Sequence, residues 1–278
     1  MEIKHKSYSG ERSLYSLKNA SLFDVTFLDG ESPLKECSSL TLDNCTFKYK
    51  YPLWYSKDII VKNSLFEEMA RSGIWYSENL SFEDVIFNSP KTFRKSKNIT
   101  LKNVDFNKAD ETLYFCDKVT INNAYIKGDY CLLGSSDIEI VDSTIEGNYC
   151  FDNASNIKAK NCTFLSRDAF WNVKDAVIED SVIDGEYLAW NSSNITFIRC
   201  KIISHQGICY SKNVKLIDCQ ITNSDLIFEY CENIDADIDV DNVSIKNPRS
   251  GSIFLSKGCK IIKNEKYIDP NKTKIVIK

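Results

Sequence analysis

A period of about nineteen residues runs through most of this 278-residue chain. An apolar residue, followed two places later by a second apolar residue, opens a new unit twelve times, and successive openings lie 19 to 21 residues apart. The openings fall at residues 20, 40, 59, 80, 99, 119, 138, 157, 176, 195, 214 and 234. Position eight of the unit is Phe or Ile in eleven of the twelve units. Self-similarity at a fixed period of this length indicates a repeat architecture.

Within each unit the apolar residues alternate with polar ones, which is the pattern of a β-strand rather than a helix. The stretch ITLKNVDF at 99–106 alternates, breaks at Asn103 and then alternates again. Position five is Asn or Asp in ten of the twelve units, with Arg199 and Ile238 as the exceptions, and a second Asn/Asp column lies just before each unit. Asn and Asp tolerate the left-handed backbone of a sharp turn. Each unit is therefore expected to contain at least two sharp corners and three short strands.

This pattern predicts an all-β fold, a single-stranded parallel β-helix (solenoid) of about twelve coils of 19–21 residues. A β-sandwich would not hold one period over such a length, and pentapeptide-repeat coils fit less well because nineteen is not a multiple of five. We expect one domain over residues 1–278, with an N-terminal cap at 1–19, coils over 20–245, and a C-terminal cap at 246–278 that includes a last strand at 272–278.

Composition narrows the choice of partners and compartment. The net charge of -4 and a pI near 5.4 argue against nucleic-acid binding, which needs a basic surface. No apolar run is long enough to span a membrane, and the first residues lack a signal-peptide core, so we expect a cytoplasmic protein with no membrane partner. The eleven cysteines include no CxxC pair, and at position six (Cys45, Cys162, Cys200, Cys219) they are expected to be reduced packing residues. We expect no cofactor and identify no metal site.

The columns NITLKNVDF at 98–106 and NIKAKNCTF at 156–164 resemble the right-handed parallel β-helix of the pectin-lyase-like superfamily. In that superfamily a short Asn turn joins two strands of each coil, which matches position five here. More narrowly, the chain resembles an uncharacterised bacterial family, the domain of unknown function numbered three-seven-three-seven. The resemblance covers roughly residues 20–245 and implies the fold without assigning an activity.

The pectin-lyase-like superfamily includes polysaccharide lyases and hydrolases. Its galacturonases use NTD, paired Asp-Asp and [GS]HG motifs. This chain has SHQG at 204–207, where Gln206 is inserted, and it has neither an NTD motif nor an adjacent Asp-Asp pair. The resemblance therefore leaves open whether the chain is an enzyme.

Four tryptophans, Trp54, Trp75, Trp171 and Trp190, each lie five residues before the next unit and so share one column. Unpaired charges are costly in a core, so a column that also contains charged residues is expected to face outward. The other members are Lys35, Arg94, Tyr114, Leu133, Asp152, Cys209 and Glu229. In proteins of the resembled superfamily the substrate lies along this face, so the four tryptophans and Asp152 are the predicted substrate-binding residues. The alternative is that the tryptophans stack in pairs and shield the sheet.

A neighbouring column contains Glu186, His205 and Asp225 on consecutive coils, and these are the predicted catalytic residues. Two coils separate Glu186 from Asp225 by about 9 to 10 Å, near the upper end of the carboxylate separation in inverting glycosidases. The alternative is a solvated column with ordinary ion pairs.

Two classes of function stay open at this point. One is a carbohydrate-binding or carbohydrate-active β-helix that uses the tryptophan face, with a neutral oligosaccharide as the partner because Asp152 and Glu186 would repel an acidic one. The other is a non-catalytic scaffold whose surface binds another protein or itself. The sequence does not indicate the oligomeric state.

Overall fold

The computed structural model describes all residues, 1–278, as two compact units, Met1–Glu146 and Gly147–Lys278. Unit 1 contains β1 (Glu2–Tyr8), β2 (Lys18–Phe27), β3 (Ser38–Asp43), β4 (Thr46–Phe47), β5 (Lys57–Lys62), β6 (Leu65–Phe66), β7 (Ile74–Trp75), β8 (Glu78–Phe87), β9 (Phe93–Arg94), β10 (Lys97–Phe106), β11 (Asp117–Lys127), β12 (Ser136–Val141) and β13 (Thr144–Glu146). Unit 2 contains β14 (Ser155–Lys160), β15 (Thr163–Leu165), β16 (Asp168–Ala169), β17 (Lys174–Glu179), β18 (Val182–Leu188), β19 (Ser193–Ile198), β20 (Lys201–Ile208), β21 (Lys212–Ile227), β22 (Glu232–Lys246), β23 (Gly251–Leu255), β24 (Lys260–Ile262) and β25 (Thr273–Ile277).

The only helical element is the short 3-10 turn η1 (Pro270–Lys272). No helix in the structure has the length and apolar character needed to cross a bilayer.

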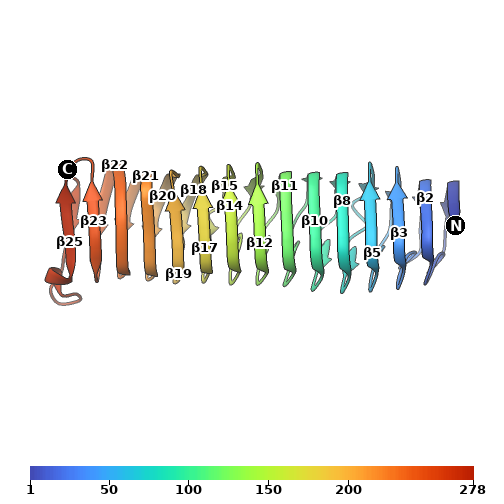
Figure 1. Ribbon diagram of the computed structural model, residues 1–278, viewed down its shortest axis with the longest axis horizontal. Coiled ribbons are helices and arrows are strands. Elements are labelled where there is room, and N and C mark those ends of the chain that lie inside the picture. Colours follow the sequence, from blue (N-terminus) through green and yellow to red (C-terminus); the bar gives the residue numbers. More distant parts are fainter. The chain divides into compact units, whose positions relative to one another are not determined.

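Within each unit, strands that are one sequence period apart pair in parallel, which makes a β-solenoid (Figure 1). In unit 1, Leu80 pairs with Ile99 and Ile99 with Val119, so three predicted unit openings stand in register. In unit 2, Ala176 pairs with Ile195 in the same way. The predicted period is therefore the coil length, and the fold class is confirmed.

The coil count is about fifteen rather than the predicted twelve. At the start of the chain, β1 pairs in parallel with β2 and forms a further coil within the predicted N-terminal cap. At the other end, β23 pairs with β22 and β25 pairs with β23 inside the predicted C-terminal cap. The last strand lies where it was expected, at Thr273–Ile277. The coils at both ends were not predicted because the Asn/Asp columns are incomplete there, although the strands still pair in parallel.

The Asn/Asp column at position five marks a left-handed corner, as predicted. Asn103 has φ 51° and Asn123 has φ 52°, and the amide of Asn123 donates to Oδ1 of Asn103 on the preceding coil at 2.9 Å. Arg199 takes the same conformation at φ 50°, and its guanidinium donates to the Asp180 carboxylate. Ile238 is not a corner residue, because the register shifts there: Leu216 pairs with Ala236, and Cys219 already pairs with Ile238.

The coils also have left-handed corners at residues whose type does not predict a turn. In the coil opening at Leu80, Lys91 and Lys95 have φ 57° and 48°, besides the expected corners at Asp84 and Asn98. Lysine has no intrinsic preference for this region, so tertiary packing must hold these two corners.

The core of unit 1 contains a continuous column of aromatic rings at position eight. Phe47, Phe66, Phe87 and Phe106 are fully buried, and the ring centroids of successive members lie 4.4 to 4.7 Å apart. This column confirms that position eight points inward, and it explains why Phe recurs there: each ring fills one coil and contacts the next.

Buried serine and cysteine side chains occupy equivalent places at two inner corners. Ser192 Oγ accepts from the Val173 N–H at 3.0 Å and donates to the Phe170 carbonyl at 2.7 Å. Two coils further along the same ladder, Cys231 Sγ takes the serine's place, accepting from Ser211 N–H and donating to the Ile208 carbonyl. All eleven cysteines are free thiols and ten are buried. Burial raises the pKa of the Cys45 thiol to about 11, which disfavours the nucleophilic thiolate there.

Candidate functional site

In unit 1 the two tryptophans of the predicted column stack in parallel on adjacent coils. The ring centroids of Trp54 and Trp75 lie 5.1 Å apart with the planes inclined by 10°. Arg94, on the next coil, places its guanidinium 4.6 Å from the Trp75 centroid. The indole N–H of Trp75 donates to the Lys91 carbonyl at 2.8 Å, and that of Trp54 donates to Ser72 at 2.5 Å. The facing sides of the two rings and both indole N–H groups are thus occupied within unit 1.

In unit 2 four aromatic rings follow one another along the solenoid, and we call them the aromatic strip: Trp171, Trp190, Tyr210 and Tyr230. Successive ring centroids lie 5.8, 4.7 and 5.2 Å apart, and successive ring planes are inclined by 31°, 42° and 43°. Beyond Tyr230, the Arg249 guanidinium lies 5.3 Å from the tyrosine ring. The rings are tilted rather than parallel, so part of each face is left uncovered by its neighbour.

The aromatic strip differs from the tryptophan pair of unit 1 in its indole hydrogen bonds. The buried Nε1 of Trp171 has no hydrogen-bond partner. Tyr210 is 40% exposed. The exposed ring surface of the strip is what a bound ligand could contact.

The tyrosines of the strip do not lie in the predicted column. That column continues from Trp190 to Cys209 and Glu229, as the backbone bond from Asn191 to Cys209 shows. Cys209 is fully buried, so the expectation that the whole column faces outward was wrong at that position. A register shift in which Leu188 pairs with Ile208 distorts this coil, and the aromatic run passes to the following residue.

Asp152, a predicted ligand contact, is engaged in a corner ladder. Its Oδ1 accepts from the amides of Asn153 and Asn172, each at 2.9 Å, and Asn191 in turn donates to Asn172. The carboxylate lies one coil before Trp171 in backbone register. Its role toward a ligand stays a prediction.

Glu186 is paired with an arginine beside the strip. Its carboxylate lies 2.9 Å from Nε of Arg167, whose guanidinium is 5.9 Å from the ring centroid of Tyr187. Tyr187 contacts the edge of the Trp171 ring at a centroid distance of 6.2 Å. Arg167 therefore offsets the charge of Glu186 next to the strip.

His205 and Asp225 lie on neighbouring coils, as the sequence predicted, with Nδ1 and Oδ2 3.8 Å apart. Their side chains are 59% and 70% exposed, so water screens the pair. Catalysis by Glu186, His205 and Asp225 stays a prediction, and this open setting resembles the solvated column that was its alternative.

Sequence reasoning missed Asp168, which pairs in backbone register with Tyr187. Asp168 is 3% exposed, and its carboxylate reaches no closer than 4.0 Å to the guanidinium of Arg167. Burial raises the pKa of Asp168 above its usual range, Arg167 opposes the rise, and the Glu186 charge adds to it. The one available signal was an Asp beside two buried apolar residues, Ala169 and Phe170, at the start of a strand.

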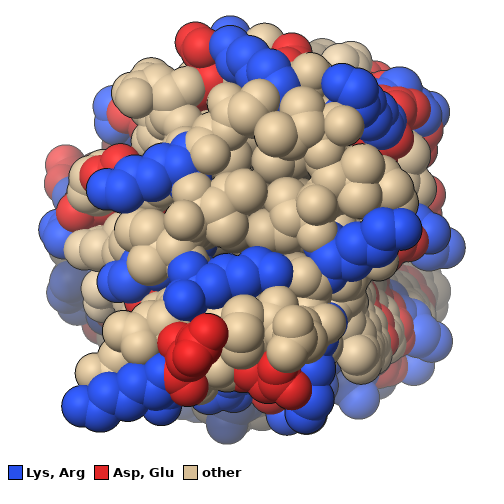
Figure 2. All heavy atoms as spheres, turned by 90° about the vertical axis from the view of Figure 1, so that its left-hand side faces the viewer, with Lys and Arg blue, Asp and Glu red and all other residues tan.

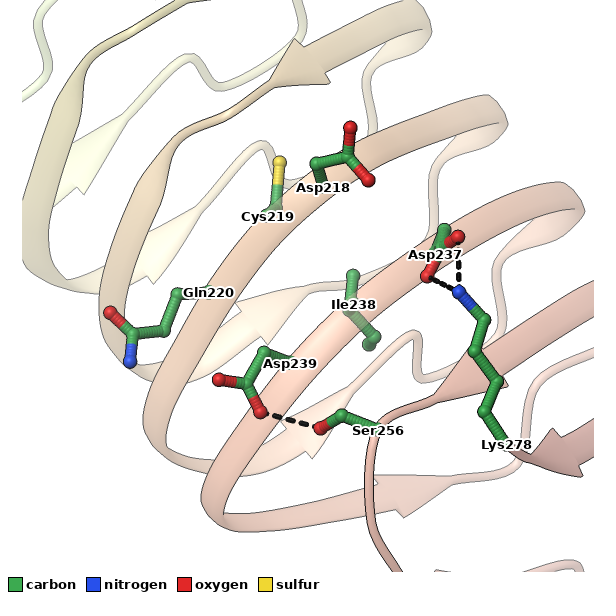
Figure 3. A pocket seen from close by; sticks show the side chains of 8 residues that line it. All are labelled: Asp218, Cys219, Gln220, Asp237, Ile238, Asp239, Ser256 and Lys278. Atoms are coloured by element: carbon green, nitrogen blue, oxygen red, sulfur yellow. Dashed lines mark hydrogen bonds and ion pairs between the residues drawn. The ribbon is translucent and has the colours of Figure 1, made fainter.

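No group of three or more His, Cys, Asp or Glu side chains is placed to hold a metal ion. A shallow hollow of about 370 Å³ lies at a corner of the last coils of unit 2 (Figure 3). There Lys278 Nζ is ion-paired with Asp237, and Ser256 Oγ donates to Asp239 Oδ1 at 2.5 Å. The missing corner residue beside Ile238 opens this hollow, and none of the predicted site residues lines it.

The family model DUF3737, described as "Protein of unknown function (DUF3737)", matches residues 1–276. The chain belongs to this family. No curated protein matches the sequence.

Among solved structures, the chain is similar to PfbA, a surface adhesin of Streptococcus pneumoniae, at 12% identity and a TM-score of 0.28, covering 96% of this chain and 74% of that one. It is also similar to the catalytic domain of a GH87 alpha-1,3-glucanase in complex with tetrasaccharides, at 10% identity and a TM-score of 0.31, covering 99% of this chain and 63% of that one. Likenesses this weak assign no activity to the DUF3737 chain.

Proposed function

We propose that unit 2 binds a neutral oligosaccharide along the aromatic strip, and that it binds this ligand rather than cleaving it. The observation that carries the proposal is the difference between the two tryptophan pairs. Trp54 and Trp75 are parallel with bonded indole N–H groups, whereas Trp171 and Trp190 are inclined by 31° and the indole N–H of Trp171 has no partner.

The spacing of the rings supports a saccharide ligand. Ring centroids in the aromatic strip recur every 4.7 to 5.8 Å, close to the strand spacing of about 4.8 Å and to the length of one pyranose step. A saccharide running along the strip would place one sugar near each ring. Sugars have apolar C–H faces that stack on aromatic rings, which suits the tilted ring faces of the strip.

Binding is favoured over cleavage by the setting of the predicted catalytic groups. Glu186 is neutralised by Arg167, and His205 and Asp225 are open to water. General acid catalysis needs a carboxyl group that stays protonated near the working pH, usually in an enclosed site.

A second candidate, hydrolysis, is favoured by one observation. Asp168 is buried with a raised pKa, and Glu186 follows it on the next coil. In this reading Asp168 would be the general acid and Glu186 the nucleophile, because one coil separates them by about 4.8 Å of strand spacing, close to the carboxylate separation of retaining glycosidases.

One experiment tests both readings. A panel of neutral gluco-, manno-, xylo- and galacto-oligosaccharides is titrated by calorimetry against the wild type and against Trp190→Ala and Tyr210→Ala, with Trp75→Ala as the matched control in unit 1. We expect each strip variant to weaken binding about tenfold and the control to leave it unchanged. Chromatography of the same mixtures should show intact sugars, and products that disappear in Asp168→Asn would establish hydrolysis instead. Binding that survives both strip variants, or no binding at all, would overturn the proposal and favour the scaffold.

A further inference from the structure

The last part of unit 2 is strongly basic although the chain as a whole is acidic. Residues 257–278 contain seven lysines and only two acidic residues, Glu265 and Asp269, in a chain of net charge -4. Figure 2 views unit 2 from this end and shows Lys and Arg side chains spread around a largely uncharged centre, with few acidic groups among them. The net charge of the whole chain, which argued against a nucleic-acid partner, does not reveal this local excess of lysine.

Three of these seven lysines form ion pairs or hydrogen bonds within the fold. Lys257 is paired with Asp241 at 2.8 Å, Lys278 with Asp237, and Lys263 donates to the carbonyls of Pro270 and Thr273. Four others are exposed and have no acidic partner: Lys260, Lys266, Lys272 and Lys274.

Apolar side chains are exposed among the lysines. Ile261 in β24 is 40% exposed, Tyr267 is 54% exposed and Ile277 in β25 is 57% exposed. β24 pairs with β22 and β25 pairs with β23, each along one edge. Lys266 lies 5.6 Å from the ring centroid of Tyr267. The surface therefore combines free ammonium groups with aliphatic and aromatic side chains.

We propose that this basic end of unit 2, residues 257–278, binds the surface of a membrane that contains anionic lipids. Clustered lysines are attracted to anionic headgroups, and exposed Ile and Tyr side chains can enter the boundary between headgroups and acyl chains. A nucleic acid would satisfy the lysines but would leave Ile261 and Ile277 without an apolar contact, so the lipid surface fits the combination better.

Lysines on edge strands also discourage edge-to-edge pairing. That role accounts for Lys274 in β25 and for Lys278 directly after it. It does not account for Lys266 and Lys272, which lie outside the strands, or for the exposed ring of Tyr267.

The test is co-sedimentation of the full chain with vesicles of phosphatidylcholine, with and without phosphatidylglycerol. We expect binding only to the anionic vesicles, weakening as salt is raised. The variant Lys260→Glu/Lys272→Glu/Lys274→Glu should bind at least about tenfold more weakly. Its control, Lys158→Glu/Lys174→Glu/Lys201→Glu, changes the net charge equally at exposed lysines elsewhere in unit 2 and should bind within about threefold of the wild type.

Tyr267→Ser, which alters an exposed side chain and leaves the charge intact, should weaken binding to anionic vesicles about threefold or more. Circular dichroism melting confirms that each variant is folded. The proposal is overturned if the wild type does not bind anionic vesicles, if both triple variants lose binding equally, or if phosphatidylcholine alone binds as well. Tighter binding to a DNA duplex than to the vesicles would assign the surface to nucleic acid instead.

Discussion

Trp171 and Trp190 lie on adjacent coils with ring centroids 5.8 Å apart and ring planes inclined by 31°. The indole N–H of Trp171 donates to no group of the protein. In unit 1 the same column position gives a parallel, hydrogen-bonded pair, Trp54 and Trp75. The same tryptophan column thus gives two different surfaces. In unit 1 the rings are parallel and both indole N–H groups have partners, whereas in unit 2 the rings are inclined and the N–H of Trp171 has none.

Replacement of Phe106 by Ala should be among the costliest changes in unit 1. Phe106 is fully buried and stacks on Phe87 at 4.4 Å, so the substitution leaves a cavity between coils. We expect a loss of about 3 to 5 kcal/mol in the free energy of unfolding, measured by urea denaturation. Phe115→Ala, at a half-exposed ring, is the control and should cost about 1 kcal/mol or less. Equal costs would show that position eight is not the core.

The inner corner ladders predict that serine and cysteine are interchangeable where alanine is not. Ser192→Ala would leave the buried Val173 N–H and the Phe170 carbonyl without this partner and should cost about 1 to 3 kcal/mol. Ser192→Cys should cost clearly less, because Cys231 already makes the equivalent bonds. Thermal melting of the two variants decides the point, and a cysteine variant as unstable as the alanine variant would contradict it.

Asn194 tests the corner ladder that runs along the outside of unit 2. It has φ 56°, donates to Asp175 at 2.7 Å and accepts from Asn213 at 2.7 Å. Asn194→Gly keeps the left-handed backbone and loses the side-chain bonds, whereas Asn194→Ala loses both. We therefore expect the alanine variant to be less stable than the glycine variant by about 1 kcal/mol in chemical denaturation. If the glycine variant were the less stable of the two, the left-handed backbone at residue 194 would not be what makes the alanine variant unstable.

The buried carboxyl group of Asp168 predicts a pH-dependent stability difference. Its pKa is raised in the folded state, so the folded protein binds the proton more tightly than the unfolded chain does. Stability from this group is full below the unfolded pKa near 3.8 and is lost as pH rises through the folded pKa. Asp168→Asn should therefore raise the melting temperature relative to wild type at pH 7, and the difference should shrink as pH falls toward 3.8. A difference that does not change with pH would exclude a raised pKa.

The sequence predicted the coil and two of its corners well because those features depend on local chemistry. Apolar alternation places Ile99 and Leu101 inward, and Asn103 tolerates the left-handed turn that follows them. The corners at Lys91 and Lys95 were not predictable, because lysine carries no such preference and the surrounding coils impose the conformation.

The residues of the aromatic strip were predicted only where the tryptophan column keeps the same position in successive coils. Trp171 and Trp190 were found by their spacing, but Tyr210 was missed because the aromatic run passes to the next residue after Trp190. Asp168 was missed for another reason: its burial is created by neighbouring coils and leaves no mark in the local sequence. The basic surface at 257–278 was hidden because net charge sums over the whole chain.

The most direct test of the proposed ligand site follows the four indole N–H resonances by ¹⁵N NMR during titration with neutral oligosaccharides, each resonance assigned with a single Trp→Phe variant. The account predicts that the Trp171 and Trp190 signals shift on binding. Those of Trp54 and Trp75, which already donate to backbone carbonyls, should stay in place. If the Trp54 and Trp75 signals move while those of the strip do not, or if all four remain unchanged with every sugar in the panel, the assignment of the ligand site to the aromatic strip is wrong.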